Sequence, residues 1–261
     1  MTLELAFLLG RHPVAVFFAL MLLSGGLAAL AWRYIVAGST PAGAARATRR
    51  RQVAWLAGLL ALLVFAALAT GLYRDGWQLA FDDTLAATLS EHASAGWLWA
   101  WSWLTVAGDR DLLIGLGAAV FLLLLWRRAW HEAALWLAGT AGAGLLNMLL
   151  KASFARARPE HTHGFAVADG WSFPSGHSTG AMAFYGMLAY LLVRHLPPRW
   201  RAAVAVASAM LVAAVGYSRI VLQVHYFSDV VAAFAITGAW ILLCLGVRQA
   251  VAARASAGPR A

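Results

Sequence analysis

Residues 53–73 read VAWLAGLLALLVFAALATGLY, an apolar run without a charged side chain. A helix needs about 20 consecutive apolar residues to cross the hydrocarbon layer of a bilayer, and this run has that length. Three arginines, at 49–51, precede it, with only Gln52 between. Basic residues beside an apolar run are typical of the cytoplasmic end of a membrane span. The stretch therefore predicts a transmembrane helix.

The rest of the chain repeats this pattern. Six further apolar segments lie at 14–36, 111–126, 133–150, 176–193, 203–222 and 228–247; 111–126 is short unless it includes part of the Trp-rich stretch before it. Hydrophobic residues make up 62% of the 261 residues and charged residues 12%, whereas a soluble domain has about half and a quarter. We predict an all-α, polytopic transmembrane helical bundle with seven spans. Its expected parts are an extra N-terminal transmembrane helix with an Arg-rich loop (1–52), a six-span core (53–247) and a basic tail (248–261).

The basic residues predict the orientation of these spans. The net charge is +9, and seven spans would place one set of arginines on the same side: Arg46, Arg49, Arg50, Arg51, Arg127, Arg128, Arg194, Arg199, Arg201, Arg248, Arg254 and Arg260. The positive-inside rule makes that side cytoplasmic, so the N-terminus is expected outside and the C-terminus inside. Residues 74–105 would then form a long outer loop, whose Trp residues suggest a piece lying in the membrane interface. Alternatively 14–36 is a cleaved signal, since residues 29–31 resemble a cleavage site, but cleavage would leave the first arginine cluster outside.

The same features exclude some partners and cofactors. Arginines spread over short gaps between apolar runs do not form the basic patch of a nucleic-acid-binding protein, so we expect no nucleic acid partner. The one cysteine, Cys244, lies in an apolar run and leaves no cysteine cluster for zinc. We predict neither a metal nor another cofactor. The sequence gives no indication of the oligomeric state.

Ionisable residues at the ends of spans are costly, which makes them candidates for function. Three such clusters occupy 151–159, 174–177 and 218–229, all at the predicted outer ends. In the last cluster, His225 and Asp229 are four residues apart and would share one face of a helix. Asp229 could then fix the tautomer of His225 and make its other ring nitrogen a nucleophile, while Arg219 suits bidentate phosphate binding. A plain salt bridge between Asp229 and an arginine is the alternative explanation.

The middle cluster suits the start of a helix. Ser175 is a good N-cap for a helix that begins at Gly176, and the first-turn amides there would attract a phosphate. His177 could protonate a leaving group. An ordinary capped helix with an interfacial histidine explains the same residues.

The first cluster supplies cations. Lys151 and Arg158 are seven residues apart, which would place them two turns apart on one helical face before Pro159. Side chains that extend from a span end toward water are the alternative. We interpret Arg156, which has no evident partner in the sequence, as a solvated or headgroup-facing charge.

In this order, the clusters resemble the three signature motifs of the type 2 phosphatidic acid phosphatase (PAP2) superfamily. The matching residues are Lys151 followed after six residues by Arg158-Pro159, then Pro174-Ser175-Gly176-His177, then Ser218-Arg219 followed by His225 and Asp229. The resemblance covers 53–247 and is strongest to bacterial members. It implies a helical bundle with a metal-free site at the outer membrane boundary, where His225 forms a phosphohistidine, Asp229 orients it and His177 is the general acid. The residues that would hold the phosphoryl oxygens are Lys151, Arg158, Arg219, Ser175 and Gly176.

The resemblance favours an integral-membrane lipid phosphatase of a bacterial inner membrane, with its site facing the periplasm. Candidate substrates are undecaprenyl diphosphate, phosphatidylglycerophosphate, phosphatidate and a lipid A phosphate. A lipid phosphotransferase, which passes the phosphoryl group to another lipid, would use the same intermediate and stays open. A transporter would need polar groups at mid-span, where apart from glycines and Asn147 few occur. An inactive scaffold is disfavoured by the intact motifs.

Overall fold

The computed structural model of the chain consists of helices, and no strand occurs among the residues it describes. Those residues are 1–36, 43–74, 76–160 and 163–257, with side chains described for the same residues except 32–36, 43–47 and 255–257. The helices are α1 (Thr2–Arg11), α2 (Pro13–Val36), α3 (Gly43–Gly71), α4 (Trp77–His92), α5 (Ala95–Leu104), the 3-10 helix η1 (Thr105–Gly108), α6 (Arg110–Trp126), α7 (Trp130–Phe154), α8 (Gly176–His195), α9 (Pro198–Val221) and α10 (Phe227–Ala257). The prediction of an all-α fold is confirmed. Predictions that rest on the side chains of Arg46 and Arg260 fall outside the described residues.

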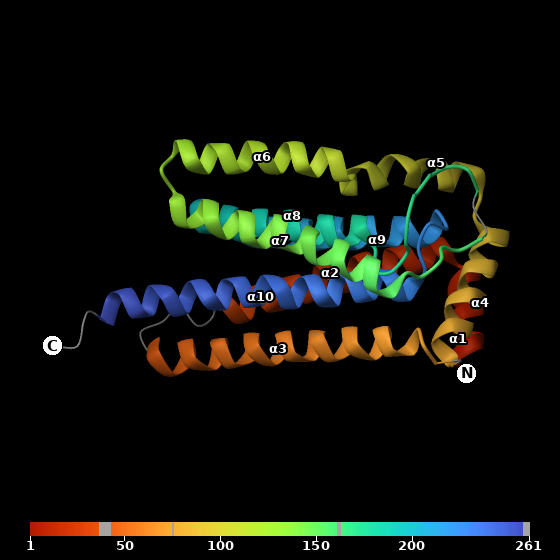
Figure 1. Ribbon diagram of the computed structural model, residues 1–261, viewed down its shortest axis with the longest axis horizontal. Helices are drawn as coiled ribbons and strands as arrows, with labels where there is room; N and C mark the ends of the chain where they lie inside the picture. Colours follow the sequence, from red (N-terminus) through yellow and green to blue (C-terminus); the bar gives the residue numbers. More distant parts are fainter. Residues whose placement is uncertain (37–42, 75, 161–162, 258–261) are drawn as a thin grey trace.

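The long helices run side by side along the molecule, and each predicted span overlaps one of them. Figure 1 shows α2, α3 and α6 to α10 along the long axis, with α1 and α4 across one end. Five helical stretches have the length and hydropathy to cross a membrane: Pro13–Ala31, Thr48–Gly71, Trp130–Phe154, Pro198–Val221 and Phe227–Arg254. Leucines of α3 such as Leu56 and Leu60 are more than 60% exposed, as expected of side chains that face lipid. The chain is a multi-pass membrane protein.

Helix α8 lies at the centre of the bundle, where α6, α7, α9 and α10 all pack against it. Its residues Ala181, Ala183 and Met187 are buried. The close approach of α7 depends on Gly139, because a Cβ at that position would lie 2.8 Å from the Sδ atom of Met187. This packing fixes the N-terminal end of α8 beside the C-terminal end of α7.

The N-terminal helices are joined to the bundle. In α2, Met21 is buried in a cluster with Trp101 and Tyr217, and the Tyr217 hydroxyl donates a 2.5 Å hydrogen bond to the Pro13 carbonyl. The segment 74–105, expected to connect two spans as an outer loop, contains the helices α4 and α5 and the start of η1. These elements cover the end of the bundle at which α7 ends and α8 begins (Figure 1).

Candidate active site

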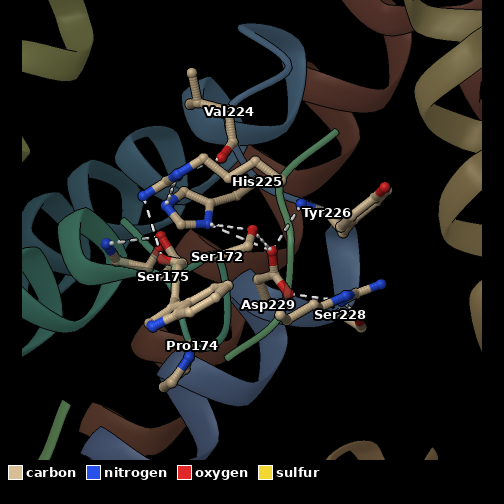
Figure 2. Close-up of polar contacts among 12 residues, drawn as sticks. Ser172, Pro174, Ser175, Val224, His225, Tyr226, Ser228 and Asp229 are labelled. Carbon is tan, nitrogen blue, oxygen red and sulfur yellow. Dashed lines mark hydrogen bonds and ion pairs between the residues drawn. The ribbon is translucent and has the colours of Figure 1, made fainter. Parts of the chain in front are cut away.

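The predicted pair of His225 and Asp229 meets in the structure. The His225 Nδ1 lies 3.4 Å from the Asp229 Oδ2, and both side chains are buried. The helical explanation for this contact was wrong, because α10 begins at Phe227 and His225 lies in the turn before it. Figure 2 shows His225 above Asp229, with several polar contacts converging on the carboxylate. The carboxylate therefore holds one ring nitrogen, as a nucleophilic histidine requires.

A tight turn between α9 and α10 sets the position of His225. The backbone amides of Val224 and His225 both donate 3.2 Å hydrogen bonds to the Arg219 carbonyl. Gln223 adopts a left-handed backbone conformation with φ 58°, which reverses the chain after the end of α9. These bonds fix the spacing between Arg219, at the end of one helix, and His225, before the next.

The contacts of His225 define its tautomer. Arg158 Nη1 lies 3.1 Å from the His225 Nε2, and because a guanidinium can only donate, Nε2 must be the unprotonated nitrogen. The proton then resides on Nδ1, which faces Asp229 Oδ2 and lies 3.2 Å from the Ser172 hydroxyl. Ser172 in turn donates to Asp229. Burial lowers the pKa of His225. The charges of Arg158 and Arg219 also lower this pKa, whereas Asp229 raises it. The net effect favours a neutral imidazole whose Nε2 carries no proton.

The two cations of the first motif contact the segments around Ser172 and His225. Lys151 does so from the end of α7, and Arg158 from the loop after it. Arg158 donates to the carbonyls of Asp169, Gly170 and Val224 at 2.6–2.9 Å. Lys151 Nζ donates to the Trp171 carbonyl and, at 3.3 Å, to that of Ser172. Both side chains thus organise the segment that carries Ser172 to His225.

The prediction that Lys151 and Arg158 share a helical face was wrong. Helix α7 ends at Phe154, and Ala155 caps it in a left-handed conformation with φ 45°. Such a C-cap redirects the chain, so Arg158 reaches the site from the loop after α7. Pro159, expected to end the helix, lies several residues beyond its end.

The second motif begins α8 as predicted. Ser175 is the N-cap, and its hydroxyl accepts from the Ser178 amide at 3.5 Å and from the Ser178 hydroxyl at 3.0 Å. The Ser175 amide donates a 3.1 Å bond to the Asp229 carbonyl, which ties the start of α8 to α10. A Cβ at Gly176 would lie 3.8 Å from Lys151 Cε, so the first turn of α8 lies beside the Lys151 side chain.

The remaining predicted residues, His177 and Arg219, also belong to this cluster. The His177 imidazole interacts electrostatically with Arg219 and His225, so both histidines lie at the same end of the bundle. Arg219 is 2% exposed, and its Nη1 donates a 2.7 Å bond to the Thr105 hydroxyl of η1. Its buried Nε has no hydrogen-bond partner within the described part of the chain. An unpaired buried donor of this kind suits an anionic ligand.

The PAP2 superfamily model matches residues 132–252, which include all three motifs. Residues 132–252 belong to the PAP2 superfamily. The chain is 34% identical over 127 residues to phosphatidylglycerophosphatase B of Bacillus subtilis, a match covering 48% of this chain and 60% of that protein. A lipid A 1-phosphatase of Rhizobium johnstonii is 40% identical over 114 residues, covering 40% of this chain and 43% of that protein. The chain thus spans less than two thirds of these relatives.

A solved structure extends the similarity beyond the PAP2 region. The crystal structure of a transmembrane PAP2-type phosphatidylglycerolphosphate phosphatase from Bacillus subtilis aligns with a TM-score of 0.68 and 26% identity. The alignment covers 74% of this chain and 96% of that one. The helices around the PAP2 motifs therefore share the arrangement of a known membrane phosphatase.

Arg156, the third cation in the first PAP2 motif, is not the solvated charge that we expected. Its side chain is 10% exposed and makes salt bridges to Asp82 at 2.8 Å and to Asp229 at 2.6 Å. No local pattern predicts this pairing, because Asp82 lies on α4, far from Arg156 in the sequence. A buried ion pair therefore lies next to the candidate nucleophile.

Sequence reasoning also missed Ser172 and Thr105. Ser172 is fully buried and contacts both His225 and Asp229, yet it is one of several serines near the PAP2 motifs. Thr105 lies far from Arg219 in the sequence.

Proposed function

We propose that this protein is an integral-membrane phosphatase that removes a phosphoryl group from a membrane lipid through a phosphohistidine at His225. The observation that carries the proposal is the arrangement of the His225 ring. Its Nδ1 is held by Asp229, and its unprotonated Nε2 points to a cation, Arg158. That combination prepares a nucleophile and places positive charge where a phosphoryl group would bind.

In the proposed first step, Nε2 of His225 attacks phosphorus while the bond from phosphorus to the leaving oxygen breaks. His177 donates a proton to that oxygen. The phosphoryl oxygens bind Lys151, Arg158 and Arg219, and Arg219 contributes its unpaired Nε. Phosphoryl transfer depends mainly on such positioning and charge neutralisation.

In the second step, water attacks the phosphohistidine and loses a proton to His177. The P–N bond breaks, inorganic phosphate leaves and neutral His225 is restored. Ser175 is engaged as the helix cap and through its amide. Its proposed part is therefore to aim the Gly176 amide and the first turn of α8 at the phosphate.

The position of the site supports the proposed substrate class. The cluster lies at one end of a bundle of apolar helices, where a lipid can keep its tail in the bilayer and present its headgroup to water. The names of the relatives, a phosphatidylglycerophosphatase and a lipid A 1-phosphatase, support a lipid phosphomonoester. The proposed topology has seven spans in a bacterial inner membrane, with the site and the N-terminus on the periplasmic side and the C-terminus in the cytoplasm.

The test is phosphate release by the purified protein in detergent. Phosphatidylglycerophosphate, phosphatidate, undecaprenyl diphosphate and a lipid A phosphate are compared by kcat/KM, with and without an acceptor lipid. His225→Ala should abolish turnover while the protein still assembles in the membrane, with the exposed Glu91→Gln as a matched control. Full activity of His225→Ala would refute the proposal, and phosphate appearing only on the acceptor lipid would make the enzyme a transferase.

A further inference from the structure

We infer that Asp82 and Arg156 are positioning residues that hold Asp229 in the orientation and charge state from which it supports His225. The inference rests on the proposed function of His225. It assigns a part in the reaction to an α4 residue that lies outside the PAP2 region 132–252.

Arg156 bridges two buried carboxylates from different helices. Its Nη1 lies 2.6 Å from Asp229 Oδ1 on α10, and its Nη2 lies 2.8 Å from Asp82 Oδ2 on α4. The Asp82 side chain is 1% exposed and that of Asp229 is fully buried. A planar guanidinium can hold both carboxylates at once, which the single ammonium of a lysine cannot do with the same geometry.

The surrounding contacts fix this bridge at the first turn of α10. Asp82 Oδ1 accepts the Ser228 amide at 3.1 Å, and Asp82 Oδ2 accepts the Ser228 hydroxyl. The Tyr226 ring centroid lies 4.1 Å from Arg156 Cζ, and the Tyr226 amide donates to Asp229 Oδ2 at 3.0 Å. Figure 2 shows Tyr226 and Ser228 on the side of Asp229 away from the His225 ring. Asp82 therefore anchors the backbone next to Asp229 as well as Arg156.

The charges explain why Asp82 matters to the chemistry. Arg156 alone would neutralise Asp229 and weaken its attraction for the His225 ring. Asp82 balances Arg156, so the three groups together keep one net negative charge beside Nδ1. His225 carries positive charge once Nε2 binds phosphorus, and at buried distances that negative charge stabilises the intermediate.

Asp82→Asn tests this inference because asparagine keeps the shape and loses the charge. We expect kcat to fall by roughly 10- to 100-fold, the size seen when partners that orient a metal-bound histidine are removed. KM should stay within about twofold, because Asp82 does not contact the phosphate site. Glu91→Gln, an exposed change on the same helix, should match the wild type. Rapid acid quench with labelled substrate gives the fraction of enzyme that forms the phosphoenzyme and the rate of its formation.

Arg156→Lys provides a second variant that keeps the charge but not the two-carboxylate fork. Arg156→Lys should slow phosphoenzyme formation as Asp82→Asn does. In the double variant, the rate of phosphoenzyme formation should be no more than about threefold below that of the slower single variant, since the two residues act as a unit. If Asp82→Asn does not accumulate in the membrane, Arg156→Lys carries the test alone. The contrary result is that either variant forms phosphoenzyme at the normal rate in a smaller fraction of the enzyme. That result would mean that Asp82 and Arg156 have only a structural role, and it would overturn the inference.

These outcomes are separate from a failure of the proposed function. Wild-type enzyme that turns over through labelled His225, with both variants unchanged in kcat, contradicts only the role of Asp82 and Arg156. Wild-type enzyme that turns over without any label on His225 contradicts the function on which that role rests.

Discussion

The hydrogen bond between Thr105 and Arg219 offers a measurable link between η1 and the phosphate site. Thr105→Val removes the hydroxyl that accepts the 2.7 Å bond from Arg219 Nη1 and keeps the side-chain shape. Both residues are at least 92% buried, so water cannot readily replace the lost partner. A hydrogen bond to a charged group contributes about 1.5–3 kcal/mol, and leaving the donor unpaired costs a similar amount.

Two effects follow from that magnitude. The melting temperature in detergent should fall by roughly 3–10 °C, since about 1 kcal/mol corresponds to a few degrees for a chain of this size. The KM for a lipid phosphate should rise by about tenfold or more, at about 1.4 kcal/mol per tenfold, because Arg219 loses the contact that aims it. Thr105→Ser, which keeps the hydroxyl, is the matched control.

The assay pairs differential scanning fluorimetry with initial rates of phosphate release over a range of substrate concentrations. If Thr105→Val matches Thr105→Ser in both melting temperature and KM, Arg219 does not depend on η1 and the reasoning is refuted. A lower melting temperature with unchanged KM would contradict the part of the reasoning that concerns phosphate binding.

Three further predictions concern the acid, the helix junction and the cofactor. His177→Ala should slow phosphoenzyme formation more for an alcohol leaving group than for a phosphate leaving group, because the poorer leaving group needs the proton; equal slowing measured by rapid quench would count against a general acid. Asn147→Leu removes hydrogen bonds to the Pro174 carbonyl at 3.3 Å and the Thr179 hydroxyl at 3.0 Å and should lower stability by about 1–3 kcal/mol; an unchanged unfolding midpoint would show that these bonds do not hold α7 to α8. Phosphate release should persist after dialysis against EDTA, and a complete loss that magnesium restores would overturn the metal-free mechanism.

The helices and the motif residues could be predicted because their signals are local. An uncharged run such as 53–73 identifies a membrane helix by length and hydropathy alone. Ser175 identifies the start of α8 because an N-cap needs only the adjacent amides. The spacing of Arg219, His225 and Asp229 was enough to predict that they share one site, although the backbone before α10 is a turn rather than the helix that we expected.

The rest depends on contacts between distant parts of the chain. Arg156 and Asp82 are separated by 74 positions in the sequence, and no pattern around either residue indicates the other. The end of α7 at Phe154 depends on Ala155 adopting a left-handed conformation, which sequence favours for glycine or asparagine far more than for alanine. Arg158 reaches His225 only because the loop after α7 offers carbonyls to its guanidinium.

Mass spectrometry of acid-sensitive peptides from rapidly quenched enzyme tests the central claim most directly. Under single-turnover conditions with a lipid phosphate, the phosphoryl group should appear on His225, at Nε2, and disappear at the rate at which inorganic phosphate is released. Phosphate release at the normal rate with His225 unmodified at every time point would contradict the account.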